Sequence, residues 1–128
     1  MNKKTMMKVA ALSGFLAVVL GAFGAHGLRP LLDEKTLHAY ETGVLYQFFH
    51  TLMLGAMAFS TKENVDRYFS KSALLFTLGM VCFSGSLYAI AFSRAAGFDL
   101  SWLGPITPLG GLMLMVGWLL LLLHAFRS

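Results

Sequence analysis

The residues best suited to chemistry are polar side chains set within an otherwise apolar sequence. Tyr40, Gln47 and His50 recur at intervals of seven and three residues, and Tyr46 lies four residues before His50. In a helix, these intervals gather the side chains on one side of the cylinder. Because histidine changes charge near neutral pH, His50 with Gln47 and Glu41 could bind a proton or a small polar ligand.

Polar residues at the ends of neighbouring apolar stretches extend this face. His26 ends the first stretch, Tyr88 lies near the end of the third, and Thr107 opens the fourth. When successive helices run in opposite directions, these ends meet on one side of the bundle, beside the start of the second stretch. We therefore predict a polar pocket open toward that side, with only His50 near mid-span, formed by His26, Tyr40, Glu41, Tyr46, Gln47, His50, Tyr88 and Thr107.

A structural interpretation of the same residues stays open. Glu41 is rotated by about a third of a turn from Gln47 and lies near a helix start, where a carboxylate favours the helix dipole. Polar side chains also join helices in membrane bundles, at roughly 0.6 to 2 kcal/mol per contact. Replacing His50 by alanine separates the two interpretations, because lost ligand or proton movement indicates a pocket, whereas lost folding indicates a tie between helices.

The sequence does not predict a metal or haem site. Haem between helices requires two histidines at one depth, but His26, His50 and His124 fall near three different depths. Thioethers prefer Cu(I), yet only Met53 and Met57 share a helical face in adjacent turns among Met53, Met57, Met80, Met113 and Met115. The sequence lacks motifs for nucleophilic catalysis, phosphate binding and zinc, so we expect no cofactor and no enzymatic activity.

The composition is that of a membrane protein. Of 128 residues, 57% are hydrophobic and only 12% are charged, whereas a soluble domain carries roughly 25% charged residues. The net charge of +4 does not indicate a nucleic-acid partner, because the basic residues lie between the apolar blocks rather than along one stripe. The single cysteine, Cys82, excludes an intramolecular disulfide and lies in an apolar run, which is typical of a packing residue.

Four apolar stretches indicate the elements that position these residues. Each is close to the ~20 residues needed to cross ~30 Å of hydrocarbon, and such long open segments cross a bilayer only as helices. We predict an all-α, polytopic membrane protein whose single domain, residues 1–128, is a four-transmembrane-helix bundle with helices at about 9–27, 39–60, 72–93 and 109–126.

The distribution of lysine and arginine predicts the orientation in the membrane. One side carries three basic residues, Arg29, Lys35 and Arg94. The other carries seven, namely Lys3, Lys4, Lys8, Lys62, Arg67, Lys71 and Arg127. Because basic loops stay in the cytoplasm, we expect a multi-pass protein of the plasma membrane with both termini cytoplasmic.

The start of the chain also has features of a signal peptide. Lys3 and Lys4 precede an apolar run, and small residues follow at Ala22 and Ala25. The apolar run is longer than the usual 7 to 15 residues of a signal-peptide core. We therefore expect the first helix to be retained.

Small residues predict how the helices pack, because membrane helices associate through close contact of small side chains. On the first stretch they form a groove for a partner helix, at Ala10, Gly14, Ala17, Gly21 and Ala25. The third stretch repeats the pattern at Gly79, Cys82, Ser86, Ala89 and Ser93, and the fourth does so at Gly110 and Gly117.

Four motifs in order give a resemblance that covers nearly the whole chain. They are the segments 21–27 (GAFGAHG), 41–50 (ETGVLYQFFH) and 83–88 (FSGSLY), and then 104–111 (GPITPLGG) followed by Gly117-Trp118. The sequence resembles the YgdD-type family of small bacterial inner-membrane proteins, which has distant relatives in eukaryotes. The resemblance implies a multi-helix inner-membrane protein without an established activity, supplies no catalytic residue, and includes the polar cluster in the family pattern.

Two classes of function follow from these observations. The first is a structural, interaction or accessory membrane protein, associated with the lipid bilayer and with a second copy or another membrane protein through its glycine grooves. The alternative is a small transporter or a ligand- or proton-binding protein that uses His50 and Gln47. The sequence does not identify a small-molecule ligand.

Overall fold

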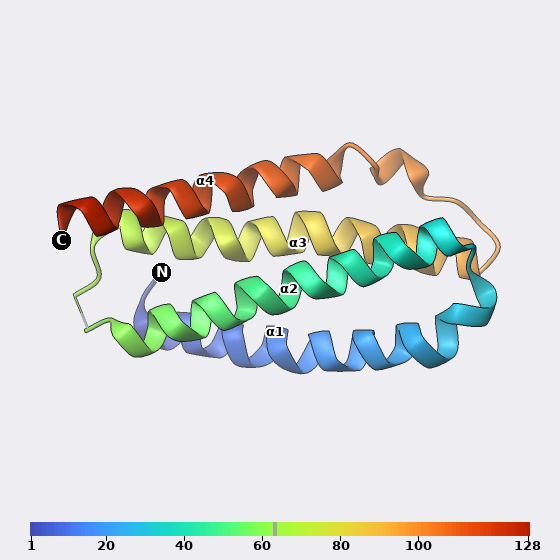
Figure 1. Cartoon of the computed structure of the whole chain (residues 1–128), viewed down its shortest axis with the longest axis horizontal. Coiled ribbons are helices and arrows are strands. Elements are labelled where there is room, and N and C mark those ends of the chain that lie inside the picture. Colours follow the sequence, from blue (N-terminus) through green and yellow to red (C-terminus); the bar gives the residue numbers. More distant parts are fainter. Residues whose placement is uncertain (63) are drawn as a thin grey trace.

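The computed structural model describes residues 1–62 and 64–128. Within them, four long helices lie side by side along the longest axis of the molecule (Figure 1). Their bounds are α1 Lys3–Phe23, α2 Glu34–Ser60, α3 Arg67–Ala95 and α4 Ile106–Arg127. The predicted all-α, four-helix membrane fold is confirmed.

Successive helices run in opposite directions. The α1–α2 and α3–α4 connections therefore lie at one end of the bundle, while both termini and the α2–α3 connection lie at the other (Figure 1). A π-helical turn, Gly24–Leu28, and a 3-10 turn, Arg29–Leu31, lead from α1 into α2, and a second 3-10 turn, Ser101–Leu103, precedes α4. This order brings the ends that carry most of the predicted polar residues to one side.

Each helix begins three or more residues before its apolar stretch, and in α1 and α3 a polar side chain binds the free backbone groups of the first turn. The side chain of Asn2 accepts a hydrogen bond from the backbone nitrogen of Thr5 at 2.8 Å and caps α1. Asp66 caps α3 in the same way, through the nitrogens of Tyr68 and Phe69. The predicted boundaries thus mark the apolar part of each helix rather than its full length.

Three of the helical segments are long and apolar enough to cross a membrane by themselves, namely Lys3–Leu31, Arg67–Ala95 and Ser101–Arg127. Helix α2 is less apolar because it contains Glu34, Lys35 and Glu41 near its start and Gln47 and His50 further along. Its 27 residues nevertheless span about 40 Å, and it lies against α1 and α3. Helix α2 therefore crosses the bilayer with them and carries the polar residues on its buried face.

The α3–α4 contact is the closest in the bundle. A Cβ atom added to Gly110 would lie 2.3 Å from the backbone nitrogen of Phe83, so the two backbones touch here. One Cβ atom on Gly79 would meet Leu114, and one on Gly117 would meet Phe76. The glycine groove predicted on the third and fourth stretches is therefore the surface that joins α3 to α4.

The small residues of α1 face α2. Gly14 lies opposite Thr51, Gly21 lies opposite Val44, and Ala17 between them is fully buried. From Gly14 to Gly21 the predicted groove on the first helix therefore holds α2, whereas Ala25, also predicted to line it, is exposed on the π-helical turn. Many large apolar side chains on the outer faces, especially of α1 and α4, are exposed, as a lipid-facing surface requires.

Candidate functional site: the polar residues of the bundle interior

Gln47 lies buried where α1, α2 and α3 meet. Its amide nitrogen donates to the carbonyl oxygen of Ser13 at 2.9 Å and to the Ser13 hydroxyl at 3.2 Å. Its amide oxygen accepts a hydrogen bond from the Tyr88 hydroxyl at 2.6 Å. A glutamine side chain has two N–H donors and one carbonyl, so both donors and the oxygen of Gln47 are engaged. One side chain of α2 therefore ties α1 to α3.

Two hydroxyl groups, one on α1 and one on α2, connect this amide to further side chains. The hydroxyls of Ser13 and Thr51 lie 2.7 Å apart, and both approach the sulfur of Met80, at 3.8 and 3.7 Å. These contacts again join α1, α2 and α3. The amide of Gln47 is thus one member of a connected network, and such networks rigidify a bundle when every member is satisfied.

Two further bonds extend the network toward the α1–α2 connection. The Tyr40 hydroxyl donates to the carbonyl oxygen of Leu20 at 2.5 Å, just before the π-helical turn. The Tyr40 ring covers Gly24, where an added Cβ atom would lie 2.4 Å from the ring. On the other side of α2, the Ser84 hydroxyl donates to the carbonyl oxygen of Gly43 at 2.6 Å. These polar groups also connect neighbouring helices.

His50 joins α2 to α4 and is held in a single tautomer. The indole nitrogen of Trp118 is 3.0 Å from Nε2, and the carbonyl oxygen of Tyr46 is 2.7 Å from Nδ1. Because an indole N–H only donates, Nε2 must accept, and Nδ1 must carry the proton that it donates to Tyr46. The imidazole is therefore neutral with both nitrogens engaged. Its ring packs against Phe76 and Trp118, with centroids at 5.2 and 5.9 Å.

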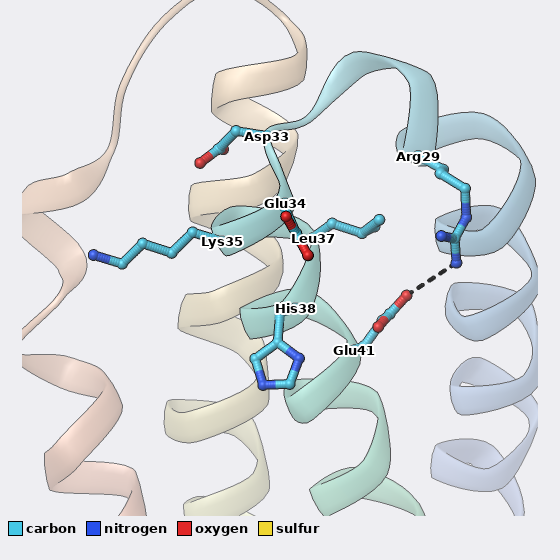
Figure 2. Close-up of a pocket in the computed structure, with 7 residues that line it drawn as sticks. All are labelled: Arg29, Asp33, Glu34, Lys35, Leu37, His38 and Glu41. Carbon is cyan, nitrogen blue, oxygen red and sulfur yellow. Dashed lines mark hydrogen bonds and ion pairs between the residues drawn. The ribbon is translucent and has the colours of Figure 1, made fainter.

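Glu41 lies on the surface at the α1–α2 end of the bundle. Its carboxylate forms an ion pair of 3.2 Å with Arg29, and both side chains are largely exposed. Figure 2 shows this pair beside the other side chains that line an open hollow, most of them charged residues of the α1–α2 connection and the start of α2. His38 points away from the Arg29–Glu41 pair in this view. Glu41 thus binds the connection rather than Gln47.

The other predicted residues lie in separate places. His26 is exposed on the π-helical turn, and Tyr46, 39% exposed, stacks on Phe83 with ring centroids 4.7 Å apart. The Thr107 hydroxyl lies 2.5 Å from that of Ser86 and joins the start of α4 to α3. The structure therefore brings together Tyr40, Gln47 and Tyr88, but it does not gather the eight predicted residues into one pocket open to one side.

Several partners of these residues were missed by sequence reasoning. Ser13, Thr51 and Ser84 are single small hydroxyl residues in apolar helices, and their spacing alone does not distinguish them from other small residues. Another hydroxyl, that of Ser72, donates to the carbonyl oxygen of Gly117 at 2.8 Å across the α3–α4 contact. Trp118 belongs to the Gly117-Trp118 motif of the family resemblance. The motif singles out this tryptophan, but it does not indicate that the indole binds His50.

At each end of the bundle, hydrogen bonds of one charged side chain join neighbouring elements, and we call each such set of contacts a clamp. At one end, Arg94 of α3 donates to the Thr36 hydroxyl of α2 at 2.6 Å and to the Ser101 hydroxyl at 2.8 Å. At the other, Asp66 at the start of α3 lies 2.9 Å from Nδ1 of His124 in α4. The hydrogen bond from His124 lowers the pKa of the Asp66 carboxyl below its ordinary value.

Within the part of the chain that the structure describes, every buried side-chain nitrogen and oxygen has a hydrogen-bond partner. No group of three or more His, Cys, Asp and Glu side chains there has the geometry to hold a metal ion. Antiparallel helices with an apolar exterior and an interior of mutually bonded polar groups define a polytopic membrane helix bundle.

This chain belongs to the DUF423 family, described as proteins of unknown function, whose sequence pattern matches residues 20–111. It is 42% identical to the UPF0382 membrane protein of Haemophilus influenzae over 127 residues, covering 98% of this chain and 97% of the relative. It is 39% identical to the UPF0382 inner membrane protein YgdD of Escherichia coli K12, over 99% of this chain and 93% of the relative.

A third relative extends the comparison beyond these two bacteria. The UPF0382 membrane protein YwdK of Bacillus subtilis is 36% identical over 126 residues, covering 97% of this chain and 98% of the relative. No solved structure matches the chain. The family resemblance found from the four motifs is confirmed, and the protein is a multi-helix protein of the inner membrane.

Proposed function

We propose that this protein is a non-catalytic scaffold of the inner membrane that acts as an interaction or accessory protein. The supporting observation is that the buried polar side chains bind one another across helices. Gln47 has no unused N–H donor, and the hydroxyls around it bind other helices. An interior of this kind fixes helix positions and presents no open group to a substrate.

The geometry of His50 supports this function over proton transfer. A general base or proton carrier needs a nitrogen that can gain a proton, but Nε2 of His50 accepts the N–H of Trp118. Protonating Nε2 would bring two N–H groups face to face and break the bond between α2 and α4. The alternative of a proton or ligand pocket around His50 and Gln47 therefore requires the helix contacts themselves to open.

The outer face of α1 and α2 offers a surface for a partner. A groove of about 520 Å³ runs between these helices, and it is lined by small residues such as Gly55 and Ala56 and by the exposed rings of Phe15 and Phe59. A Cβ atom on Gly55 would meet nothing within 4 Å, so the bundle's own packing does not require this glycine. Small residues facing lipid suit a helix of a second copy or of another membrane protein.

We further propose that both termini face the cytoplasm. Lys3, Lys4 and Lys8 belong to the same end of the bundle as Arg127 and the α2–α3 connection, and this end carries more basic residues than the other. Fusion of alkaline phosphatase or green fluorescent protein to the C-terminus tests this topology. Fluorescence without phosphatase activity is expected, and phosphatase activity would contradict it.

The interaction function is tested with the full-length chain in mild detergent, by light scattering and by identification of copurified membrane proteins. We expect an oligomer or a stoichiometric partner, and we expect Gly55→Leu to weaken this association by about fivefold, equivalent to ~1 kcal/mol. Gly85→Leu, on a different face, is the matched control and should associate normally. A monodisperse monomer without a partner would contradict the proposal, as would proton or solute flux in proteoliposomes.

A further inference from the structure

A crevice of about 400 Å³ separates α1 from α3 on the face where they do not pack closely. Leu12 and Leu16 of α1 and Val81 of α3 form its rim, and all three are exposed to lipid. Gln47 and Met80 contribute to its lining, most of which is apolar. Because Gln47 is already bonded to Ser13 and Tyr88, the crevice presents carbon rather than hydrogen-bonding groups to an occupant.

The ends of the crevice limit what fits into it. At one end the rings of Phe23 and Phe92 stack with centroids 5.8 Å apart and bridge α1 to α3. At the other, the Thr77 hydroxyl lies 3.9 Å from the sulfur of Met1. The crevice extends along α1 from Val9 to Leu20, about 16 Å at the helical rise. This is about half of the ~30 Å hydrocarbon core, which suits one acyl chain of one leaflet and is too short for a spanning helix.

A glycine in the crevice wall supports this assignment independently. A Cβ atom on Gly85 would meet nothing within 4 Å, whereas one on Gly110 would lie 2.3 Å from the backbone of α3. Close helix packing therefore does not explain Gly85. Its missing side chain instead leaves the crevice open to an occupant from the bilayer.

Basic residues mark the end at which a lipid headgroup would lie. On α1, Lys8 directly precedes Val9, where the crevice begins, and Lys4 lies about one turn earlier. Both lysines are exposed, and their long side chains reach the level of lipid phosphates while their stems lie along apolar surface. The crevice, which opens sideways to lipid, thus begins next to a basic end of the bundle, and this charge complements an anionic headgroup.

We propose that this crevice binds one acyl chain of an anionic phospholipid from the leaflet at the Lys4 and Lys8 end, with the phosphate beside these lysines. The site is independent of the proposed partner groove, since the crevice lies between α1 and α3 and the groove lies between α1 and α2. A lipid held here fills the gap between two helices that otherwise meet at the Phe23–Phe92 stack, at the Ser13–Met80 contact and through α2.

The test is native mass spectrometry of the detergent-purified full chain with added phosphatidylglycerol or with phosphatidylethanolamine of the same acyl chains. We expect wild-type protein to retain one phosphatidylglycerol, and we expect Gly85→Leu to reduce this bound fraction about tenfold because leucine fills the crevice. Gly55→Leu is the matched control, since its Cβ is equally unobstructed but faces the other groove, and it should bind lipid as the wild type does.

The headgroup assignment is tested in the double variant Lys4→Gln/Lys8→Gln, which should retain phosphatidylglycerol no better than phosphatidylethanolamine. Equal retention of the two lipids by the wild type would overturn the anionic assignment. Equal retention by Gly85→Leu and the wild type would overturn the crevice site. Circular dichroism confirms folding, and if Gly85→Leu is unfolded, Leu16→Trp fills the crevice from its lipid-exposed rim and must give the same loss.

Discussion

Helices α3 and α4 touch through their backbones, whereas α1 and α3 stand apart over an apolar crevice. At the first contact, Gly110 leaves no room for a Cβ atom, and the Ser72 hydroxyl reaches the carbonyl oxygen of Gly117 across the helices. At the crevice, Gly85 faces open space. The same residue type thus assembles helices in one region and preserves a cavity in the other. Glycine content alone does not show which role a position has, because the neighbouring helix decides it.

The largest effect should come from adding one methyl group to the closed contact. Gly110→Ala must push α4 away from the Phe83 backbone, and we expect a loss of about 3 kcal/mol of stability or failure to fold. Gly85→Ala is the control, and it should be neutral or stabilising by up to ~1 kcal/mol, since alanine favours the helix. Thermal unfolding in detergent, followed by circular dichroism, measures both. Equal destabilisation by the two variants would contradict the difference in packing between the α3–α4 contact and the crevice.

The next largest effect should come from Gln47, whose amide connects α1 to α3 beside the crevice. Gln47→Leu removes the bonds to Ser13 and leaves the buried Tyr88 hydroxyl without its acceptor, which should cost about 2 kcal/mol. The same unfolding measurement reports it. A Gln47→Leu protein as stable as the wild type that had lost a transport activity would instead favour a ligand pocket.

A smaller effect is expected at His50. His50→Ala removes the acceptor of the Trp118 indole, and we expect a loss of about 1 kcal/mol together with a change in Trp118 fluorescence. Trp118→Phe should produce a similar loss and serves as the control, because it removes the same bond from the other side. A change in proton flux in proteoliposomes without a change in stability would contradict the structural role.

The smallest effect should be the response to acid at the exposed clamp between α3 and α4. Because the pKa of Asp66 is lowered in the folded protein, the Asp66–His124 contact stabilises it above the ordinary value of 3.8. This contribution is lost as the pH falls through the lowered pKa. The melting temperature of the wild type should therefore fall more steeply below that pH than that of Asp66→Asn. Identical acid profiles of the two proteins would show that the Asp66–His124 contact does not stabilise the folded state.

Much of the fold follows from the sequence because lipid leaves a chain few options. Four apolar stretches of spanning length require four helices, and the periodic small residues of α1 correctly predict the face that holds α2. The helix ends extend further than hydropathy indicates. Caps such as Asn2 and Asp66 satisfy backbone groups in polar surroundings, so polar residues belong to the helices as well.

The partners of the polar residues could not be predicted in the same way. Spacing places Gln47 and His50 on the buried side of α2, but the first bonds α1 and α3 while the second bonds α4. Gln47 reaches a backbone carbonyl, which carries no sequence signal. Trp118 lies 68 residues from His50, so only the packing of α4 brings the two together. For Gly55 and Gly85, the absence of a close neighbour is likewise a property of the folded bundle.

In the bundle interior, buried polar residues hold the helices together. A double-mutant cycle of Gln47→Leu and Tyr88→Phe tests it most directly, because the 2.6 Å bond between these side chains links α2 to α3 in the bundle interior. We expect the two substitutions to be coupled by about 0.6 to 1.7 kcal/mol in unfolding free energy. Strictly additive effects would contradict a structural bond and with it the scaffold account.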